Sequence, residues 1–255
     1  MAMIINRSND LKVPAYNLYL DSETQIHISD GNEKMGKGVY NISLLPGAGY
    51  LKFRGWGKFP KGKPLTNIKG TCGGICEKCG CMEECYAVKA LIRQHNSCTK
   101  AWGENTLLAR EDCNRYFEEI ERFLSLNLVP VFRWHVSGEI MNMNYLCEMI
   151  RIAIDNPETQ FYVYTKAYKI VEHVVRHPED CPPNLHILVS IWHKNYKNPY
   201  GFPEFIYDDG TEEELNTVPH CPAVNRDGKE TGVTCAVCRK CWRVKNGDKI
   251  AVYAH

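Results

Sequence analysis

The sequence predicts an α/β protein built on a parallel β-sheet. Short apolar runs typical of strands alternate with segments whose apolar residues recur at helical spacing, a pattern typical of parallel strands joined by right-handed crossovers. The chain has 255 residues, of which 44% are hydrophobic and 24% charged. These proportions are those of a folded globular protein with a buried core, and they exclude a disordered, collagenous or membrane-spanning one.

The elements expected along the chain begin with a polar, turn-rich segment over 1–37 and a strand over 39–45. A glycine-rich loop over 47–70 then leads into the first group of cysteines. The elements that follow are a helix over 84–95, a helix over 105–126, a strand over 129–136, a helix over 145–154, a strand over 161–165, a helix over 167–176, a strand over 185–191 and a last strand over 250–253. Ligands of such sheets gather beyond the carboxyl ends of the strands, so polar residues there are candidate site residues.

Cysteine is the unusual residue type, with 13 in a chain that is too long to need disulfide staples. The 31 Lys and Arg nearly balance the 30 Asp and Glu, which gives no charge pattern that indicates nucleic acid or a membrane surface as a partner. No secretory signal and no long apolar run is visible, so we expect a cytoplasmic protein. In a reducing compartment, crowded thiols indicate metal binding or redox chemistry.

Five thiols lie within 14 residues and are called here the loop cysteines: Cys72, Cys76, Cys79, Cys81 and Cys85. Five exceed what one tetrahedral zinc ion can use. A short glycine-containing loop can wrap three or four thiolates around an iron-sulfur cube, which is the use that this dense spacing favours. A zinc knuckle remains the alternative.

A second group, called here the tail cysteines, consists of Cys221, Cys235, Cys238 and Cys241. A C-x2-C-x2-C run with a remote Cys-Pro is the ligand set of bacterial ferredoxins, although there the Cys-Pro follows the run and here Cys221-Pro222 precedes it. A zinc ribbon is again the alternative, because it also uses C-x2-C pairs. We therefore expect two 4Fe-4S clusters, an α/β domain over 1–219 and a cysteine-rich segment over 220–255 that closes on the same domain.

Polar residues recur at every second position in Arg133, His135, Ser137 and Glu139, so an extended strand would place them on one side of the sheet. One interpretation is an internal ion pair between Arg133 and Glu139, with His135 hydrogen-bonded nearby. The other is a polar pocket in which Glu139 accepts hydrogen bonds from a ligand ammonium and Arg133 holds a carboxylate. The residues that end the next two strands are expected at the same place: Tyr164, Lys166, Ser190, Trp192 and His193.

The spacing Cys72-x3-Cys76-x2-Cys79, followed by a helix and by Ser137-Gly138-Glu139, resembles the radical S-adenosylmethionine (SAM) enzymes. In that family C-x3-C-x2-C binds a 4Fe-4S cluster at the mouth of a partial TIM barrel, and a Gly-Gly-Glu segment binds the amino group of SAM. The resemblance implies a partial TIM-barrel-like parallel sheet and SAM as a possible cofactor. Two positions depart from the family pattern: Lys78 replaces an aromatic residue and Ser137 replaces the first glycine.

A wider set of patterns resembles the phage and prophage family called gene product eighty-eight. The patterns are Leu45-Pro46, Thr71-Cys72-x-Gly74, Cys81-x3-Cys85-Tyr86-Ala87, Arg133-x-His135-x-Ser137-Gly138-Glu139, Tyr164-Thr165-Lys166, Ser190 and the tail cysteines. This resemblance implies that Cys72, Cys81 and Cys85 are the shared ligands and that Cys76 and Cys79 are an additional pair. It names no substrate.

The leading hypothesis is an iron-sulfur enzyme of radical-SAM-like type, which carries out reductive radical chemistry on an unidentified substrate. Its partners would be an electron donor and a small-molecule ligand or SAM. Three thiols on the first cube leave one iron open for chemistry, whereas four close it and predict an electron-transfer or redox-sensing protein without catalysis. The third hypothesis is a zinc-stabilised interaction protein of a phage or prophage.

Overall fold

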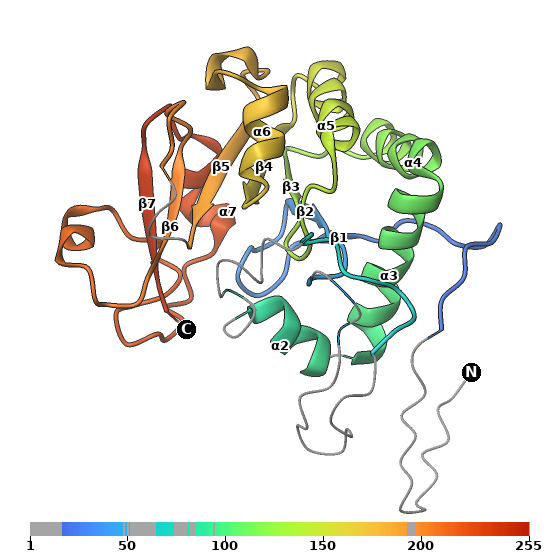
Figure 1. Ribbon diagram of the computed structural model, residues 1–255, viewed down its shortest axis with the longest axis horizontal. Helices are drawn as coiled ribbons and strands as arrows, with labels where there is room; N and C mark the ends of the chain where they lie inside the picture. The colour runs from blue at the N-terminus through green and yellow to red at the C-terminus, as the bar shows by residue number, and fades with distance from the viewer. Residues whose placement is uncertain are drawn as a thin grey trace, which may run out of the picture.

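The strands of the described residues form one sheet, in the same order in space as in the sequence (Figure 1). The computed structural model describes residues 17–47, 49, 51, 65–73, 81, 85–93, 95–192 and 197–254. The strands are β1 (Ile28–Asp30), β2 (Val39–Ile42), β3 (Val131–Trp134), β4 (Gln160–Thr165), β5 (Leu185–Ile191), β6 (Glu204–Asp208) and β7 (Lys249–Tyr253). β1 is antiparallel to β2, and every other neighbouring pair is parallel. The predicted α/β class with a mostly parallel sheet is confirmed.

Helices cover one face of this sheet. They are α3 (His95–Glu111), α4 (Cys113–Leu126), α5 (Met143–Asp155) and α6 (Tyr168–Val174). The remaining helix, α2 (Tyr86–Arg93), packs against α3 through Leu91 and Leu107 in a separate cluster. α3 to α6 follow one another along one side in Figure 1, and their apolar residues form a buried core with Phe132, Trp134, Phe161 and Val163 of the sheet. Within the described part of the chain, no helix combines the length and the apolar character that crossing a membrane requires.

The C-terminal segment covers the other face. Its short elements are η2 (Glu213–Thr217), α7 (Cys235–Cys238) and η3 (Lys240–Trp242); a further short turn, η1 (Pro178–Asp180), precedes β5. Trp242 of η3 packs with Tyr162 and Leu188 of the sheet in a second buried cluster. In the register of the sheet Arg133 lies beside Asn41 on β2 and beside Tyr162 on β4. The tail cysteines therefore lie over the centre of the sheet.

Two sequence predictions need correction, and two strands were missed. The helix predicted over 105–126 is two helices, because Asp112 ends α3 and caps α4 by accepting a hydrogen bond from the Arg115 amide. The strand predicted over 129–136 is β3, which ends at Trp134. β1 and β6 were not predicted at all. Both are short, at three and five residues, and neither carries a long apolar run.

Candidate functional site

The four tail cysteines line one small pocket. It has a volume of about 20 Å³, and its lining is Tyr164, Cys221, Pro222, Ala223, Val233, Thr234, Cys235, Cys238, Arg239, Lys240, Cys241 and Trp242. Its base is the sheet, through Tyr164, and its outer wall is the turn over 233–241. The ligand set expected from the C-x2-C-x2-C spacing is thus gathered in one place.

Local backbone geometry explains why the three clustered thiols point the same way. Cys235 and Cys238 are the ends of a single helical turn, in which residues three apart share a face. Arg239 then adopts a left-handed conformation with φ of 59° and ends that turn. Cys241 lies in the 3₁₀ turn that follows, in which residues three apart are again eclipsed. The spacing of three therefore places the thiols on one side of the segment.

Cys221 is positioned at the pocket by a different set of contacts. Its amide donates a hydrogen bond of 2.7 Å to the carbonyl of Ala251 on β7. The neighbouring His220 stacks on Tyr253, with 4.0 Å between ring centroids, and its Nε2 lies 2.8 Å from a carboxylate oxygen of Asp208. Asp208 is a buried residue at the end of β6, and its hydrogen bond with His220 fixes the segment that contains Cys221.

Burial favours the protonated form of three of the tail thiols. Burial raises the pKa of the Cys241 thiol to about 12, and burial also raises the pKa of Cys221 and of Cys235. A metal that binds here must displace these protons. Among the residues that the structure describes, no group of three or more His, Cys, Asp or Glu side chains could hold a metal ion as placed.

Arg133 faces the tail pocket. Its guanidinium carbon lies 4.7 Å from the ring centroid of Tyr164 and 5.8 Å from that of Tyr162. Its Nη1 donates a weak hydrogen bond of 3.7 Å to the sulfur of Met35, and its buried Nε has no partner. The predicted ion pair with Glu139 is not formed, because the two side chains lie on different elements of the site and Glu139 binds elsewhere.

His135 ends the alternation of side chains that would have placed the four polar residues on one side of the sheet. It follows the last residue of β3 and has a φ of +54°, which turns the chain, so the prediction that Arg133, His135, Ser137 and Glu139 share one side is wrong. Its Nε2 lies 2.9 Å from the hydroxyl of Tyr145, which in turn bonds to Tyr116 in the helical layer. Burial, with a contribution from the charge of Arg133, lowers the pKa of His135 to about 3, so its ring is neutral.

The segment Ser137-Gly138-Glu139 packs against the loop that carries Cys72. Gly138 has a φ of +89°, and a Cβ there would lie 2.6 Å from the Cβ of Leu44 and 2.8 Å from Oγ1 of Thr71, so only glycine fits. The amide of Leu44 donates to the carbonyl of Ser137, and the amide of Glu139 donates to Oγ1 of Thr71. The hydroxyl oxygen of Ser137 is buried without a partner.

The carboxylate of Glu139 is held by its own chain. Oε1 accepts hydrogen bonds from the hydroxyl of Thr165 at 2.6 Å and from the amide of Ile140 at 2.8 Å, and Oε2 accepts from the amide of Lys166 at 2.7 Å. These bonds tie the end of β3 to the end of β4. An ionised carboxylate has about four acceptor positions, and these bonds use three of them.

We expect the substitution Glu139→Gln to flatten the pH dependence of folding. Burial raises the pKa of Glu139 despite its hydrogen bonds, so the folded state holds this proton more tightly than the unfolded state does. The stability from this group is complete below the unfolded pKa and is lost as the pH rises through the folded pKa. Gln cannot titrate, so urea unfolding between pH 4 and 8 should show a smaller decline than in the parent. Identical slopes would contradict this account of Glu139.

Cys72 is fixed by two hydrogen bonds with Gly47. Its amide donates to the carbonyl of Gly47 at 2.9 Å, and the amide of Gly47 lies 3.2 Å from its sulfur. An amide that donates to a cysteine sulfur is one of the means by which proteins set the potential of iron-sulfur clusters. Cys81 is buried and Cys85 directly precedes α2. Cys76 and Cys79 lie outside the described residues.

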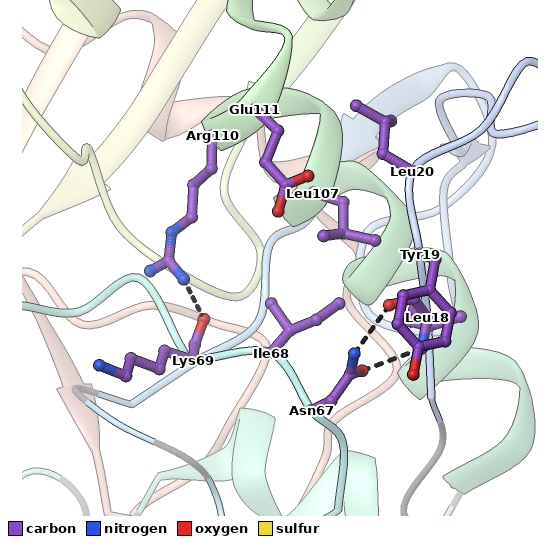
Figure 2. A pocket seen from close by; sticks show the side chains of 9 residues that line it. All are labelled: Leu18, Tyr19, Leu20, Asn67, Ile68, Lys69, Leu107, Arg110 and Glu111. Atoms are coloured by element: carbon purple, nitrogen blue, oxygen red, sulfur yellow. Dashed lines mark hydrogen bonds between the residues drawn. The ribbon is translucent and has the colours of Figure 1, made fainter.

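A cavity of about 400 Å³ lies beside this loop, between the segment 18–20, the segment 67–69 and α3 (Figure 2). On one side of it Arg110 donates to the carbonyls of Lys69 and Gly70, each at 2.7 Å. On the other side Asn67 exchanges two hydrogen bonds with the backbone of Leu18. Arg110 thus fixes the turn that leads to Cys72. The cavity lies among the residues that support this turn.

The residues expected at the ends of β4 and β5 do not form a single group. Tyr164 belongs to the tail pocket, whereas the Lys166 ammonium lies 5.4 Å from the ring centroid of Trp192. Trp192 stacks on Tyr207 at 3.9 Å, so one face of its indole is already covered. Ser190 is buried, and its carbonyl accepts a hydrogen bond from Tyr168. His193 lies outside the described residues.

Sequence reasoning missed Met35, Tyr162 and Trp242. All three are buried between the sheet and the C-terminal segment, and Met35 also binds that segment through its carbonyl, which accepts from the amide of Ala236 at 2.9 Å. Tyr162 had a signal, since it lies at an alternate position to Tyr164 in a strand whose end was already a candidate. Met35 had none, because it lies in a turn-rich segment far from the cysteines in sequence.

The fold and the site define a mixed α/β protein with a mostly parallel sheet and a cysteine-lined pocket on the face that the C-terminal segment covers. The model of the family Gene product 88 matches residues 26–244, which is most of the chain, and the protein belongs to this family. The resemblance to this phage-type family is thereby confirmed. Comparison with curated proteins gave no match, and comparison with solved structures gave none either.

Proposed function

We propose that this protein is an iron-sulfur protein whose tail cysteines hold a 4Fe-4S cluster. The observation that carries the proposal is the single pocket lined by Cys221, Cys235, Cys238 and Cys241, which come from two separate segments. Four thiols in one pocket are the full ligand set of a cube. No packing requirement explains four thiols here, since a buried apolar residue would fill the same space.

The spacing of the tail cysteines in the sequence favours a cube over a single zinc ion, because a third cysteine follows the C-x2-C pair at the same interval. As they are placed, the described cysteines could hold no single ion. The free space in the pocket is that of about one water molecule, so the binding of a cube would require the lining of the pocket to move.

A second cluster is proposed at the loop cysteines. Cys72 is held by two hydrogen bonds: its amide donates to the Gly47 carbonyl, and the Gly47 amide donates to its sulfur. The segment Ser137-Gly138-Glu139 supports the neighbouring Thr71, whose Oγ1 accepts from the Glu139 amide. If Cys72, Cys81 and Cys85 are the only ligands, one iron remains open and can bind a ligand. That open iron is the basis of the enzyme form of the proposal, in which reductive cleavage of SAM yields an organic radical.

The radical-SAM-like form has support from the order of the sheet. Six consecutive parallel strands, from β2 to β7, lie side by side in sequence order, which is the topology of a barrel sheet or of part of one. Glu139 has one acceptor position left for a SAM ammonium. Arg133 faces the tail pocket. It could therefore bind the carboxylate of SAM only if that carboxylate reached the tail pocket.

The second candidate function is electron transfer or redox sensing without catalysis. The hydrogen bonds of Glu139 favour it, since they show that this residue has a structural role that needs no ligand. One experiment distinguishes the two functions. SAM is added to the dithionite-reduced protein, and the electron paramagnetic resonance signal and the formation of 5′-deoxyadenosine are measured. The enzyme form predicts an altered signal and the formation of 5′-deoxyadenosine, and the electron-transfer form predicts neither.

The assignment to iron-sulfur proteins is tested by the absorption spectrum of protein purified without oxygen. The account predicts a brown protein with broad charge-transfer absorption in the visible region that bleaches on reduction with dithionite. A colourless protein that carries zinc would support the zinc-stabilised interaction protein instead.

A further inference from the structure

Positively charged side chains gather on the C-terminal segment, although charge is balanced over the whole chain. Arg239, Lys240, Arg243 and Lys245 follow one another closely in the sequence, and all four are exposed. They are called here the basic turn. Asp248 is the one acidic residue of the sequence over 231–249. The nearly equal totals of basic and acidic residues therefore conceal a local excess of positive charge.

The local backbone holds these cations on the surface. Arg239 ends α7 with a φ of 59°, and its Nε donates a hydrogen bond of 2.8 Å to the carbonyl of Ala236. Lys240 begins η3, and its carbonyl accepts a hydrogen bond of 2.9 Å from the amide of Arg243. Residues three apart in a 3₁₀ turn are eclipsed, so these two cations share one side. Trp242 between them is buried against the sheet and anchors the turn.

No cation of the basic turn forms an ion pair with a residue that the structure describes. Oδ2 of Asp248 accepts a hydrogen bond of 2.7 Å from the amide of Lys245. Glu230, the acidic residue that precedes the turn in the sequence, pairs with Lys34 at 3.1 Å. The acidic residues over 212–214 follow β6, whereas Lys245 precedes its parallel neighbour β7, so they lie toward opposite ends of this strand pair. The positive charge is thus available to an anionic partner.

The side chains around the cations indicate the kind of anion. Membrane-binding surfaces combine cations with bulky apolar side chains, whereas the exposed apolar residue beside this turn is the small Val237. Surfaces that bind single strands present aromatic rings on which bases stack, whereas Trp242 is buried. Lysine and arginine without such neighbours bind the phosphate oxygens of a duplex, and these contacts read no sequence.

We infer that the basic turn binds the phosphate backbone of double-stranded nucleic acid without sequence specificity. The inference goes beyond the proposed function and does not depend on it, since neither a cysteine nor a metal takes part. Each neutralised phosphate of a DNA duplex releases counterions, which gives a slope of about −0.9 in log K against log salt. Four cations that each contact one phosphate predict a slope of about −3.6, or a loss of about a hundredfold in affinity between about 50 and 200 mM salt.

The test is a titration of a fluorescently labelled DNA duplex of about 20 base pairs, followed by anisotropy at several salt concentrations, with the full chain purified without oxygen. The parent should bind with a dissociation constant of about 1 to 100 μM. The triple variant Lys240→Gln, Arg243→Gln and Lys245→Gln should bind more weakly, and its slope should be smaller in magnitude by about 2.7. Arg239 is kept, because its side chain supports the turn.

The matched control removes three exposed cations from the helical side of the protein: Arg122→Gln, Lys169→Gln and Arg176→Gln. It has the same net charge as the first variant and should keep the affinity and the slope of the parent. Equal losses in the two variants would show that net charge alone matters and would overturn the inference.

Three further results would overturn it: no binding by the parent at about 50 mM salt and about 100 μM protein, an affinity that does not depend on salt, or tighter binding to the single strand or to phosphatidylserine vesicles than to the duplex. Should the triple variant fail to fold, the single exposed substitution Lys245→Gln should lower the slope by about 0.9, and an unchanged slope would contradict the inference. Iron and sulfide content, which tests the proposed function, is independent of all these results.

Discussion

Replacing Cys235, Cys238 and Cys241 with Ala should remove about half of the iron from anaerobically purified protein, because each of two cubes holds about four iron atoms. The variant should also unfold at a lower temperature. The turn over 233–241 is held by backbone hydrogen bonds to Lys34 and Met35 and by packing against the sheet, and a metal bound by its three cysteines would be a further anchor that the variant loses. Iron analysis and thermal unfolding followed by circular dichroism measure the two effects.

The matched control replaces three cysteines outside the pocket: Cys113, Cys147 and Cys181. Each of them is a free thiol in the structure, and none lines the tail pocket. This variant should keep the iron content of the parent. If the tail variant keeps all of its iron, the tail cysteines are not ligands and the principal assignment fails.

The substitution Gly138→Ala should lower the free energy of unfolding by about 3 kcal/mol, from the left-handed backbone and from the overlap with Leu44 together. A Cβ at this position meets Leu44 and Thr71 at distances that no relaxed structure shows. Thr71 directly precedes Cys72, so the variant should also bind less iron at the loop cysteines. Urea unfolding and iron analysis measure these effects.

Gly232→Ala is the control for the backbone conformation alone. Gly232 has a φ of +81°, and a Cβ there has no neighbour within 4 Å. Its substitution should cost only the strain of the left-handed conformation, about 1 to 2 kcal/mol. If the two variants are equally stable, the close contact of Gly138 with Leu44 and Thr71 is not a constraint in solution.

The fold was predictable to the extent that local patterns determine it. The alternation of strands and helices identified β2, β3, β4, β5 and β7 and the parallel sheet. Asp112 was not recognised as the cap that divides α3 from α4, because the apolar positions continue across it. β1 and β6 are too short to show a period, and their place depends on neighbouring strands far away in sequence.

The residues of the site were largely predictable from the sequence, but their arrangement in space was not. The spacing of Cys235, Cys238 and Cys241 indicated a common ligand set because it follows the local turn. The prediction that His135, Ser137 and Glu139 share one side of the sheet with Arg133 was wrong for a different reason. The positive φ of His135 ended the alternation after β3, and a backbone conformation that non-glycine residues rarely adopt has no signature in the residue types around it. The packing of Met35 against Arg133 and α7 is a long-range contact that local pattern cannot reveal.

The measurement that tests the central claim most directly is the content of iron and acid-labile sulfide per chain in protein purified without oxygen. The account predicts about eight iron and eight sulfide, as two cubes require. About four iron and four sulfide per chain would indicate one cluster, at only one of the two cysteine groups. Protein that contains no acid-labile sulfide and about one or two zinc ions per chain would contradict the account.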